Sequence, residues 1–164
     1  MEKINLEKLY KLQAELDDEI ARNHNVSYAS THEKRLLALT VELGELANET
    51  RCFKYWSLKP ASPKEIVMDE YADGIHFLLS LGIPLNAIKM EYELTPNPDE
   101  LTVQFHNMYR LVSELKEYYD LAHYEKTMQY YLNMVLSLGF TGKDIVDSYL
   151  SKLEVNHKRQ ENKY

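Results

Sequence analysis

Apolar residues recur at three- and four-residue steps through most of this chain, and no other feature limits its possible folds as strongly. The first such segment, residues 3–22, places six of them on one side of a helix: Ile4, Leu6, Leu9, Leu12, Leu16 and Ile20. This spacing is typical of an amphipathic α-helix, whereas the two-residue alternation of a half-buried strand is scarce. Only five glycines and five prolines interrupt the 164 residues. The chain is therefore predicted to be all-α.

The residues between the apolar segments divide the chain into six or seven helices. Ser62, Pro63 and Glu65 are typical of a helix start, and Gly82 and Gly139 are typical of helix ends. We expect helices over residues 3–22, 32–51, 63–81, 85–93, 99–121, 124–138 and 142–160, the last one capped by Thr141. The length allows one domain with a real core, so residues 1–164 are predicted to form a single multi-helix bundle.

Composition argues against several classes of protein. The formal net charge is −7, and no block of Lys and Arg occurs before Lys158 and Arg159, so a nucleic-acid partner is not expected. Cys52 is the single cysteine, which excludes an internal disulfide. Neither a signal peptide nor a run of 18 apolar residues is visible, so we expect no membrane contact and a cytoplasmic protein.

Two pairs of acidic residues, Glu42 with Glu45 and Glu70 with Asp73, are each spaced three apart. On a helix this spacing puts both carboxylates on one face, and two such faces could hold a hard cation such as Mg²⁺. An isolated pair is usually a solvated helix face, but here the neighbours are strongly apolar, and a buried charge needs a partner. Gly74, directly after Asp73, indicates either a ligand or a tightly packed helix at this point.

Aromatic and basic residues lie together in the segment after the first acidic pair. Trp56 is flanked by Lys54 and Lys59, which suits a ligand with a base and phosphates, although an aromatic residue is most often part of the core. His76 and Phe77 lie in an apolar helix, and by default both are core residues.

Three polar residues form a stripe along the last predicted helix, at Lys152, Asn156 and Arg159. One interpretation is a helix end whose cations compensate the helix dipole. The other is a stripe that binds phosphate through its cations and a sugar or base through its amide.

These motifs together resemble the dimeric, all-α dUTPases, which belong to the MazG-like nucleoside triphosphate pyrophosphatases. The resemblance is carried by ELGELANETRCFKYW, by the acidic pair inside DEYADGIHFLLSLG, and by the terminal pattern YLxKxxxNxxRQ. It covers most of the chain, from Leu12 to Tyr164. The family commonly ends in a Gly-Tyr pair, and Lys163 stands here in place of that glycine.

The resemblance implies a role for each group of residues. Glu42, Glu45, Glu70 and Asp73 would bind Mg²⁺. The deoxyuridine pocket would be lined by Gln13, Trp56, Phe77 and Asn156. Phosphate would be bound by Lys54, Lys152 and Arg159.

We therefore expect a Mg²⁺-dependent enzyme that hydrolyses dUTP to dUMP and pyrophosphate, with dUDP as a further candidate substrate and Glu45 as the proton acceptor. Two alternatives stay open. One is a related pyrophosphatase that acts on dCTP or a modified nucleotide, and the other is a helical binding protein without turnover.

The same resemblance implies a homodimer. The segment from Met128 to Met134, with its tyrosines and methionines, offers more apolar surface than a small bundle easily buries. Such surface commonly contacts a symmetric copy.

Overall fold

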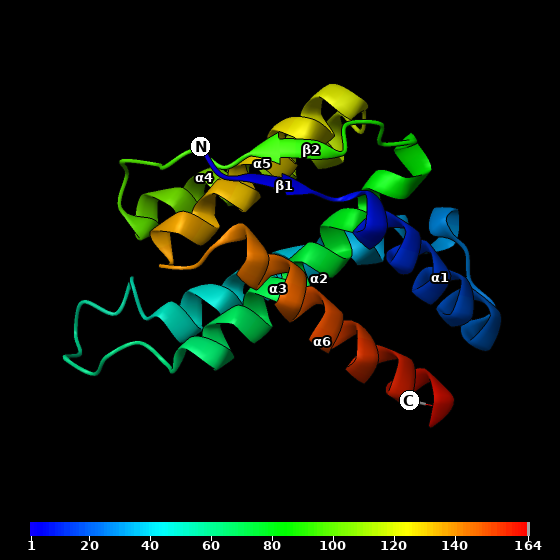
Figure 1. Ribbon diagram of the computed structural model, residues 1–164, viewed down its shortest axis with the longest axis horizontal. Coiled ribbons are helices and arrows are strands. Elements are labelled where there is room, and N and C mark those ends of the chain that lie inside the picture. Colours follow the sequence, from blue (N-terminus) through cyan, green and yellow to red (C-terminus); the bar gives the residue numbers. More distant parts are fainter. Residues whose placement is uncertain (164) are drawn as a thin grey trace.

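Six α-helices form within residues 1–163, the part of the chain that the computed structural model describes (Figure 1). They are α1 (Glu7–His24), α2 (Tyr28–Thr50), α3 (Lys64–Gly82), α4 (Leu101–Glu117), α5 (Leu121–Ser137) and α6 (Gly142–Glu161), with a 3-10 helix η1 (Ile83–Leu85) after α3. The all-α prediction is confirmed, since the described residues add only two three-residue strands, β1 (Lys3–Asn5) and β2 (Glu91–Glu93). None of these helices has an apolar stretch long enough to cross a bilayer.

Reciprocal side-chain caps start two of the helices. At α6, the Thr141 hydroxyl accepts a hydrogen bond from the backbone N–H of Asp144, and the Asp144 carboxylate accepts one from the N–H of Thr141. Ser27 forms the same arrangement with Ser30 at the start of α2. Each cap satisfies N–H groups that the first helical turn leaves without a partner. The predicted cap at Thr141 is therefore confirmed.

Ser62 and Gly82, the predicted start and end signals of α3, act differently from the prediction. Ser62 does not cap α3, which begins at Lys64, because its hydroxyl donates to the carboxylate of Glu49. α3 ends at Gly82, within one residue of the predicted end, but Gly82 has a φ of −79° and is not a left-handed cap; the chain continues into η1 and turns at Asn86, which has a φ of 55°. Gly139 ends α5 as predicted, with a φ of 86°, a conformation that glycine adopts without steric cost.

The predicted helix over residues 85–93 is also wrong, and Ile4 is not helical. β1 pairs antiparallel with β2, so that Ile4 faces Tyr92 in the register and both side chains are buried. Their neighbours point outward, and Lys3 pairs with Glu91 at 3.2 Å. The alternation in each segment lasts three residues, which is too short to distinguish from a helical pattern without knowledge of the pairing.

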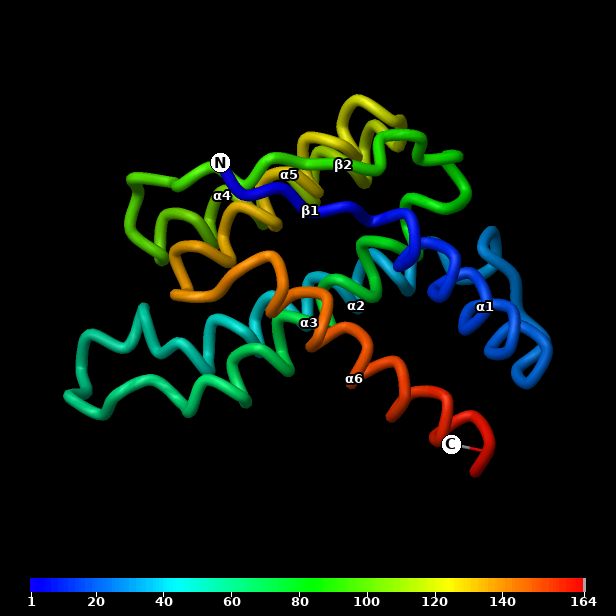
Figure 2. The backbone as a smooth tube through the Cα atoms, in the orientation of Figure 1, coloured from blue at the N-terminus to red at the C-terminus, as the bar shows by residue number. Residues whose placement is uncertain are grey.

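Helix α3 lies at the centre of the molecule. It packs against α2 along one side and also contacts α1, α5 and α6 (Figures 1 and 2). The α4–α5 hairpin and the small sheet lie above it in these views, while the segment between α2 and α3, residues 51–63, projects from the left edge. A helix with neighbours on several sides must be apolar on most of its surface, which explains the long apolar run in the second half of α3.

Two glycines of α3 allow tyrosines of α5 to approach its backbone. A Cβ atom on Gly74 would overlap the hydroxyl and ring of Tyr131, and one on Gly82 would overlap those of Tyr124. The Tyr131 ring also stacks on Tyr71, with centroids 4.4 Å apart, and each of these two hydroxyls donates to the other residue's backbone carbonyl at 2.8 Å. Of the two interpretations of Gly74, the structure supports close helix packing.

We predict that Gly74→Ala lowers the free energy of unfolding by about 1–3 kcal/mol. The added methyl group must displace Tyr131, which is buried and joined to Tyr71 by two hydrogen bonds. Gly44→Ala is the control, since its Cβ would lie 3.2 Å from the hydroxyl of the half-buried Tyr109 and alanine favours a helix by about 1 kcal/mol. Urea unfolding of both variants measures the difference. Equal stability of Gly74→Ala and the wild type would contradict the packing argument.

Candidate active site

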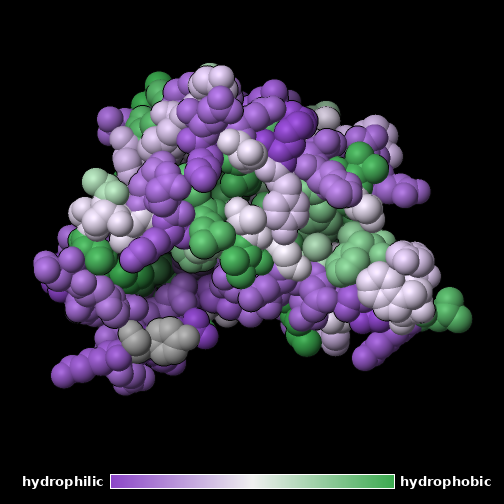
Figure 3. Space-filling view, turned by 180° about the vertical axis from the view of Figure 1, so that it is seen from behind, coloured by the Kyte–Doolittle hydropathy of each residue, from purple (hydrophilic) through white to green (hydrophobic). Residues whose placement is uncertain are grey.

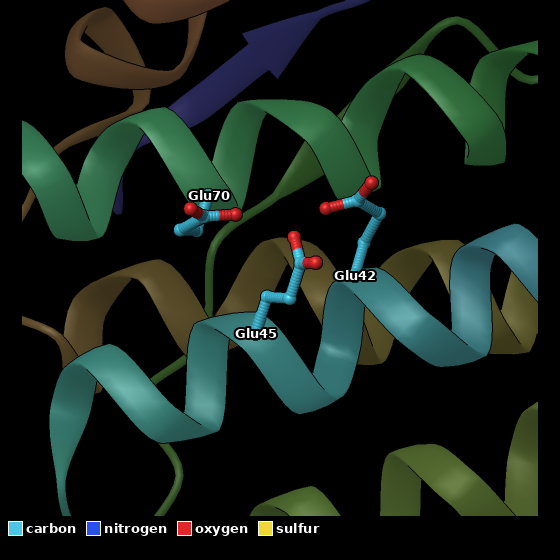
Figure 4. A group of neighbouring side chains, drawn as sticks. All are labelled: Glu42, Glu45 and Glu70. Atoms are coloured by element: carbon cyan, nitrogen blue, oxygen red, sulfur yellow. The ribbon is translucent and has the colours of Figure 1, made fainter.

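Three glutamates come together between α2 and α3. Glu42 and Glu45 lie on α2, and Glu70 faces them from α3, with all three side chains directed toward the space between the helices (Figure 4). One carboxylate oxygen of each residue lies within 4.8 Å of the corresponding oxygens of the other two. Glu45 is exposed, whereas Glu42 and Glu70 are half-buried. The i,i+3 spacing on α2 produces this arrangement because it directs both carboxylates toward the neighbouring helix.

The two half-buried glutamates lack partners for their charge. Glu42 Oε2 and Glu70 Oε2 are buried, and neither has a hydrogen-bond donor within residues 1–163. Burial, together with the negative charges of Asp73, Glu45 and Glu70, raises the pKa of Glu42 to about 8. Burial, Asp73 and Glu45 raise the pKa of Glu70 to about 7. Oxygen donors that repel one another in this way fit a divalent cation, which would pair with all of them.

Asp73 lies beside this cluster but is paired with a cation from another helix. Lys152 of α6 places its Nζ atom 3.2 Å from Asp73 Oδ1 and 2.8 Å from Asp69 Oδ2. Burial raises the pKa of Asp73, while Lys152 lowers it. Two residues predicted to bind different parts of a metal–nucleotide complex, Asp73 and Lys152, thus contact each other in this structure.

A cavity of about 830 Å³ extends from the carboxylates between α1, α2, α3 and α6. Its walls include four of the predicted substrate-binding residues, namely Gln13, Phe77, Asn156 and Arg159, together with Glu42 and Asp73 from the predicted metal site. The volume lies within the range of pockets that hold small ligands. The structure therefore brings predicted base-binding, phosphate-binding and metal-binding residues to one cavity.

Several residues of the site were not predicted. Asp17, Tyr28, Arg35 and Ser80 line the cavity. His76, expected only as a core residue, is buried but also contributes to the cavity wall. Asp17 follows Gln13 by four residues on α1, so the helical spacing contained a signal for it, whereas the others depend on how the helices cross.

Asp69, the second partner of Lys152, was missed as well. It precedes Asp73 by four residues and therefore lies on the same face of α3. Its contact with Lys152 could not be expected without knowing that α6 crosses α3 at this point.

Lys54 and Trp56 are not among the described residues that line this cavity. Both belong to the projecting segment 51–63 (Figure 1). The Trp56 side chain is exposed and contacts Tyr55 and Phe53 edge-on, with ring centroids 5.2 and 6.0 Å away, while Lys54 Nζ lies 5.8 Å from the centre of the Phe53 ring. A ligand in the cavity would not meet these two side chains of its own chain.

Lys163, at the position of the expected glycine, has a φ of 56°. A glycine adopts this left-handed conformation more readily than lysine does. Lys163 therefore adopts a backbone conformation that a glycine at this position would adopt at lower cost.

A family model described as dUTPase matches residues 5–164 of the chain. No curated protein matches it. The matched range includes every residue of the carboxylate cluster and of the cavity walls.

The raised pKa values predict how metal-free protein responds to pH. Glu42 and Glu70 hold protons more tightly in the folded chain than in the unfolded chain, so their contribution to stability is present at low pH and lost as the pH rises toward about 8. When a chelator keeps the protein free of metal, we expect the free energy of unfolding to fall between about pH 5 and 8. Glu42→Gln should make this fall smaller, because it removes one of the two groups that cause it. Urea titrations across this range provide the measurement. The same fall in the wild type and in Glu42→Gln would show that other groups cause it.

Proposed function

We propose that this chain, which belongs to the all-α dUTPase family and is a dUTP diphosphatase, works with Mg²⁺. The ion would be bound by Glu42, Glu45, Glu70 and Asp73. The observation that carries the proposal is the cluster of three glutamates with two buried oxygens lacking partners. Carboxylate oxygens are the ligands that Mg²⁺ takes from proteins, and substrate phosphates commonly complete its coordination. The adjoining cavity supplies space for the nucleoside.

Bound Mg²⁺ would neutralise the phosphate chain and lower the pKa of the attacking water. Glu45 is the exposed member of the cluster, so water can reach its carboxylate, and it would accept the proton as the water attacks phosphorus. Glu42 and Glu70 are less accessible and would serve only to hold the cation.

The cations of α6 would bind the phosphates. Lys152 pairs with both Asp69 and Asp73 in this structure, and the Lys152 side chain is only 8% exposed. With Asp73 among the ligands of the cation, Lys152 would keep Asp69 as its partner and could also donate to a phosphate oxygen. Arg159 lines the cavity closer to the end of α6 and would contact the phosphate chain there.

The nucleoside would occupy the cavity beyond the carboxylates. Phe77 would stack on the pyrimidine ring, and the amides of Gln13 and Asn156 would contact its polar edge. All three residues line the cavity, and they come from α3, α1 and α6 respectively.

We propose further that the enzyme is a homodimer. The expectation that the segment from Met128 to Met134 contacts a second copy is wrong. Met128, Tyr131, Leu132 and Met134 are buried within their own chain and offer no surface to a partner. Exposed apolar side chains lie instead on α2, at Leu37 and Val41, and in the projecting segment, at Phe53, Tyr55, Trp56 and Leu58. Hydrophobic side chains at the tip of that segment are visible at the right edge of Figure 3.

A dimer formed through these surfaces would give the projecting segment a function. Trp56 and Lys54 do not line the cavity of their own chain, and in a dimer they would complete the partner's site. This arrangement reconciles the roles that the resemblance implies for both residues with where they lie.

The test of the proposed chemistry is pyrophosphate release from dUTP with and without Mg²⁺. Glu45→Gln keeps the shape and removes the proton acceptor, so we predict a loss of at least about 100-fold in kcat with the fold retained. Glu49→Gln is the matched control one helical turn further on α2, where the side chain accepts from Ser62, and it should keep near-wild-type turnover. Comparable turnover in Glu45→Gln and wild type would remove Glu45 from the mechanism.

The test of the dimer is sedimentation at micromolar concentration, where we predict a species of twice 19.3 kDa. Leu37→Glu should shift this species to the monomer, because it places a charge in the apolar contact. Ile88→Glu is the control, since Ile88 is also exposed but lies outside α2 and the projecting segment. A wild type that sediments as a 19.3 kDa monomer would refute the dimer.

A further inference from the structure

The side-chain amide of Gln13 is held by three other residues at the wall of the cavity. Its Nε2 donates to Asp17 Oδ1 at 2.9 Å. Its Oε1 accepts from the Tyr149 hydroxyl at 3.0 Å and lies 2.7 Å from His76 Nδ1. Gln13 is only 3% exposed, so these contacts from α1, α3 and α6 hold its amide in one place.

Asp17 determines the orientation of the Gln13 amide, that is, whether Nε2 or Oε1 faces the carboxylate. A hydroxyl can donate or accept, and a neutral imidazole can carry its proton on either nitrogen, so Tyr149 and His76 could serve both orientations. An ionised carboxylate only accepts, and the carbonyl of Gln13 would be repelled if it faced Asp17. The other Asp17 oxygen, Oδ2, accepts from the Tyr28 hydroxyl at 3.0 Å, which holds the carboxylate in position.

This orientation limits what Gln13 can offer a ligand. A carbonyl oxygen has two lone pairs, and those of Oε1 face the Tyr149 hydroxyl and His76 Nδ1. One of the two Nε2 hydrogens is used by Asp17. The group that remains is the second N–H, so Gln13 can act toward a nucleobase as a hydrogen-bond donor and not as an acceptor.

A fixed donor distinguishes the two common pyrimidines at position 4. Uracil has a carbonyl oxygen there, which accepts, whereas cytosine has an amino group, which donates. We infer that Asp17 is a positioning residue that fixes Gln13 as a donor to the 4-carbonyl of uracil and thereby selects against cytosine nucleotides. This inference rests on the proposed function, in which Gln13 contacts the base.

The competing explanation is that Asp17 only stabilises the packing of α1 through Gln13 and Tyr28. In that case its replacement would impair the hydrolysis of every nucleotide to the same extent. A role in orienting Gln13 would instead change the ratio between nucleotides, because only that role depends on the polarity of the base edge.

The experiment measures kcat/KM for dUTP and for dCTP with Asp17→Asn. An asparagine can donate as well as accept, so the Gln13 amide can turn and present its carbonyl to the cytosine amino group. We predict that the preference for dUTP over dCTP falls by about tenfold or more. Glu15→Gln is the control, because it removes an exposed carboxylate of the same helix that does not line the cavity, and it should keep the wild-type preference within about twofold.

A second variant keeps the inference testable if Asp17→Asn does not fold. Gln13→Met has a similar shape but no donor, so kcat/KM should fall for dUTP and stay nearly constant for dCTP. Binding of dUMP and dCMP by calorimetry gives the same comparison without turnover.

The possible outcomes separate the inference from the function on which it rests. An active wild type whose preference for dUTP survives both Asp17→Asn and Gln13→Met would overturn the role of Asp17 alone. Parallel losses with both nucleotides in either variant would do the same. A wild type inactive toward dUTP would remove the proposed function and this inference with it.

Discussion

Carboxylates held between α2 and α3 repel one another, and the packing of α3 has to offset this repulsion. Bringing Glu42 and Glu70 together removes both from water and leaves an oxygen of each without a donor in residues 1–163. Isolated helices would separate to relieve this repulsion. Contacts on the adjoining part of α3 oppose this separation, because Tyr131 and Tyr124 of α5 pack into the gaps left by Gly74 and Gly82. The tyrosine contacts thus keep α3 in a position in which the carboxylates of its acidic face lie close to those of α2 without a compensating cation.

Helical periodicity was sufficient to predict the fold class and most of the helices, because the amphipathic pattern of each helix depends only on residues within that helix. The parts that were wrong depend on distant residues. Tyr92 is in a strand because Ile4 lies opposite it, and Gly82 is a glycine because Tyr124 approaches it. Ser62 bonds to Glu49 rather than to its own helix. None of these partners is visible from local spacing.

The same division applies to the site. The two acidic pairs predicted which helix faces carry the carboxylates, since the i,i+3 geometry is local. The pairing of Lys152 with Asp73 depends on where α6 crosses α3, and the absence of Trp56 from the cavity of its own chain depends on the direction of the projecting segment. Resemblance to a family supplied roles for these residues but could not show where they lie relative to the cavity.

The crossing of α6 over α3 has a consequence for how the protein is made. Glu42 to Asp73 is a short, continuous part of the chain, so the acidic face can assemble early in synthesis. The bond from Tyr149 to Gln13 joins residues 136 positions apart, and Lys152 and Asn156 follow it. On the ribosome these residues emerge well after the acidic face. A nascent chain would therefore expose Asp69 and Asp73 without a cation until α6 arrives with Lys152, and only then would it have a cavity that can recognise a nucleotide.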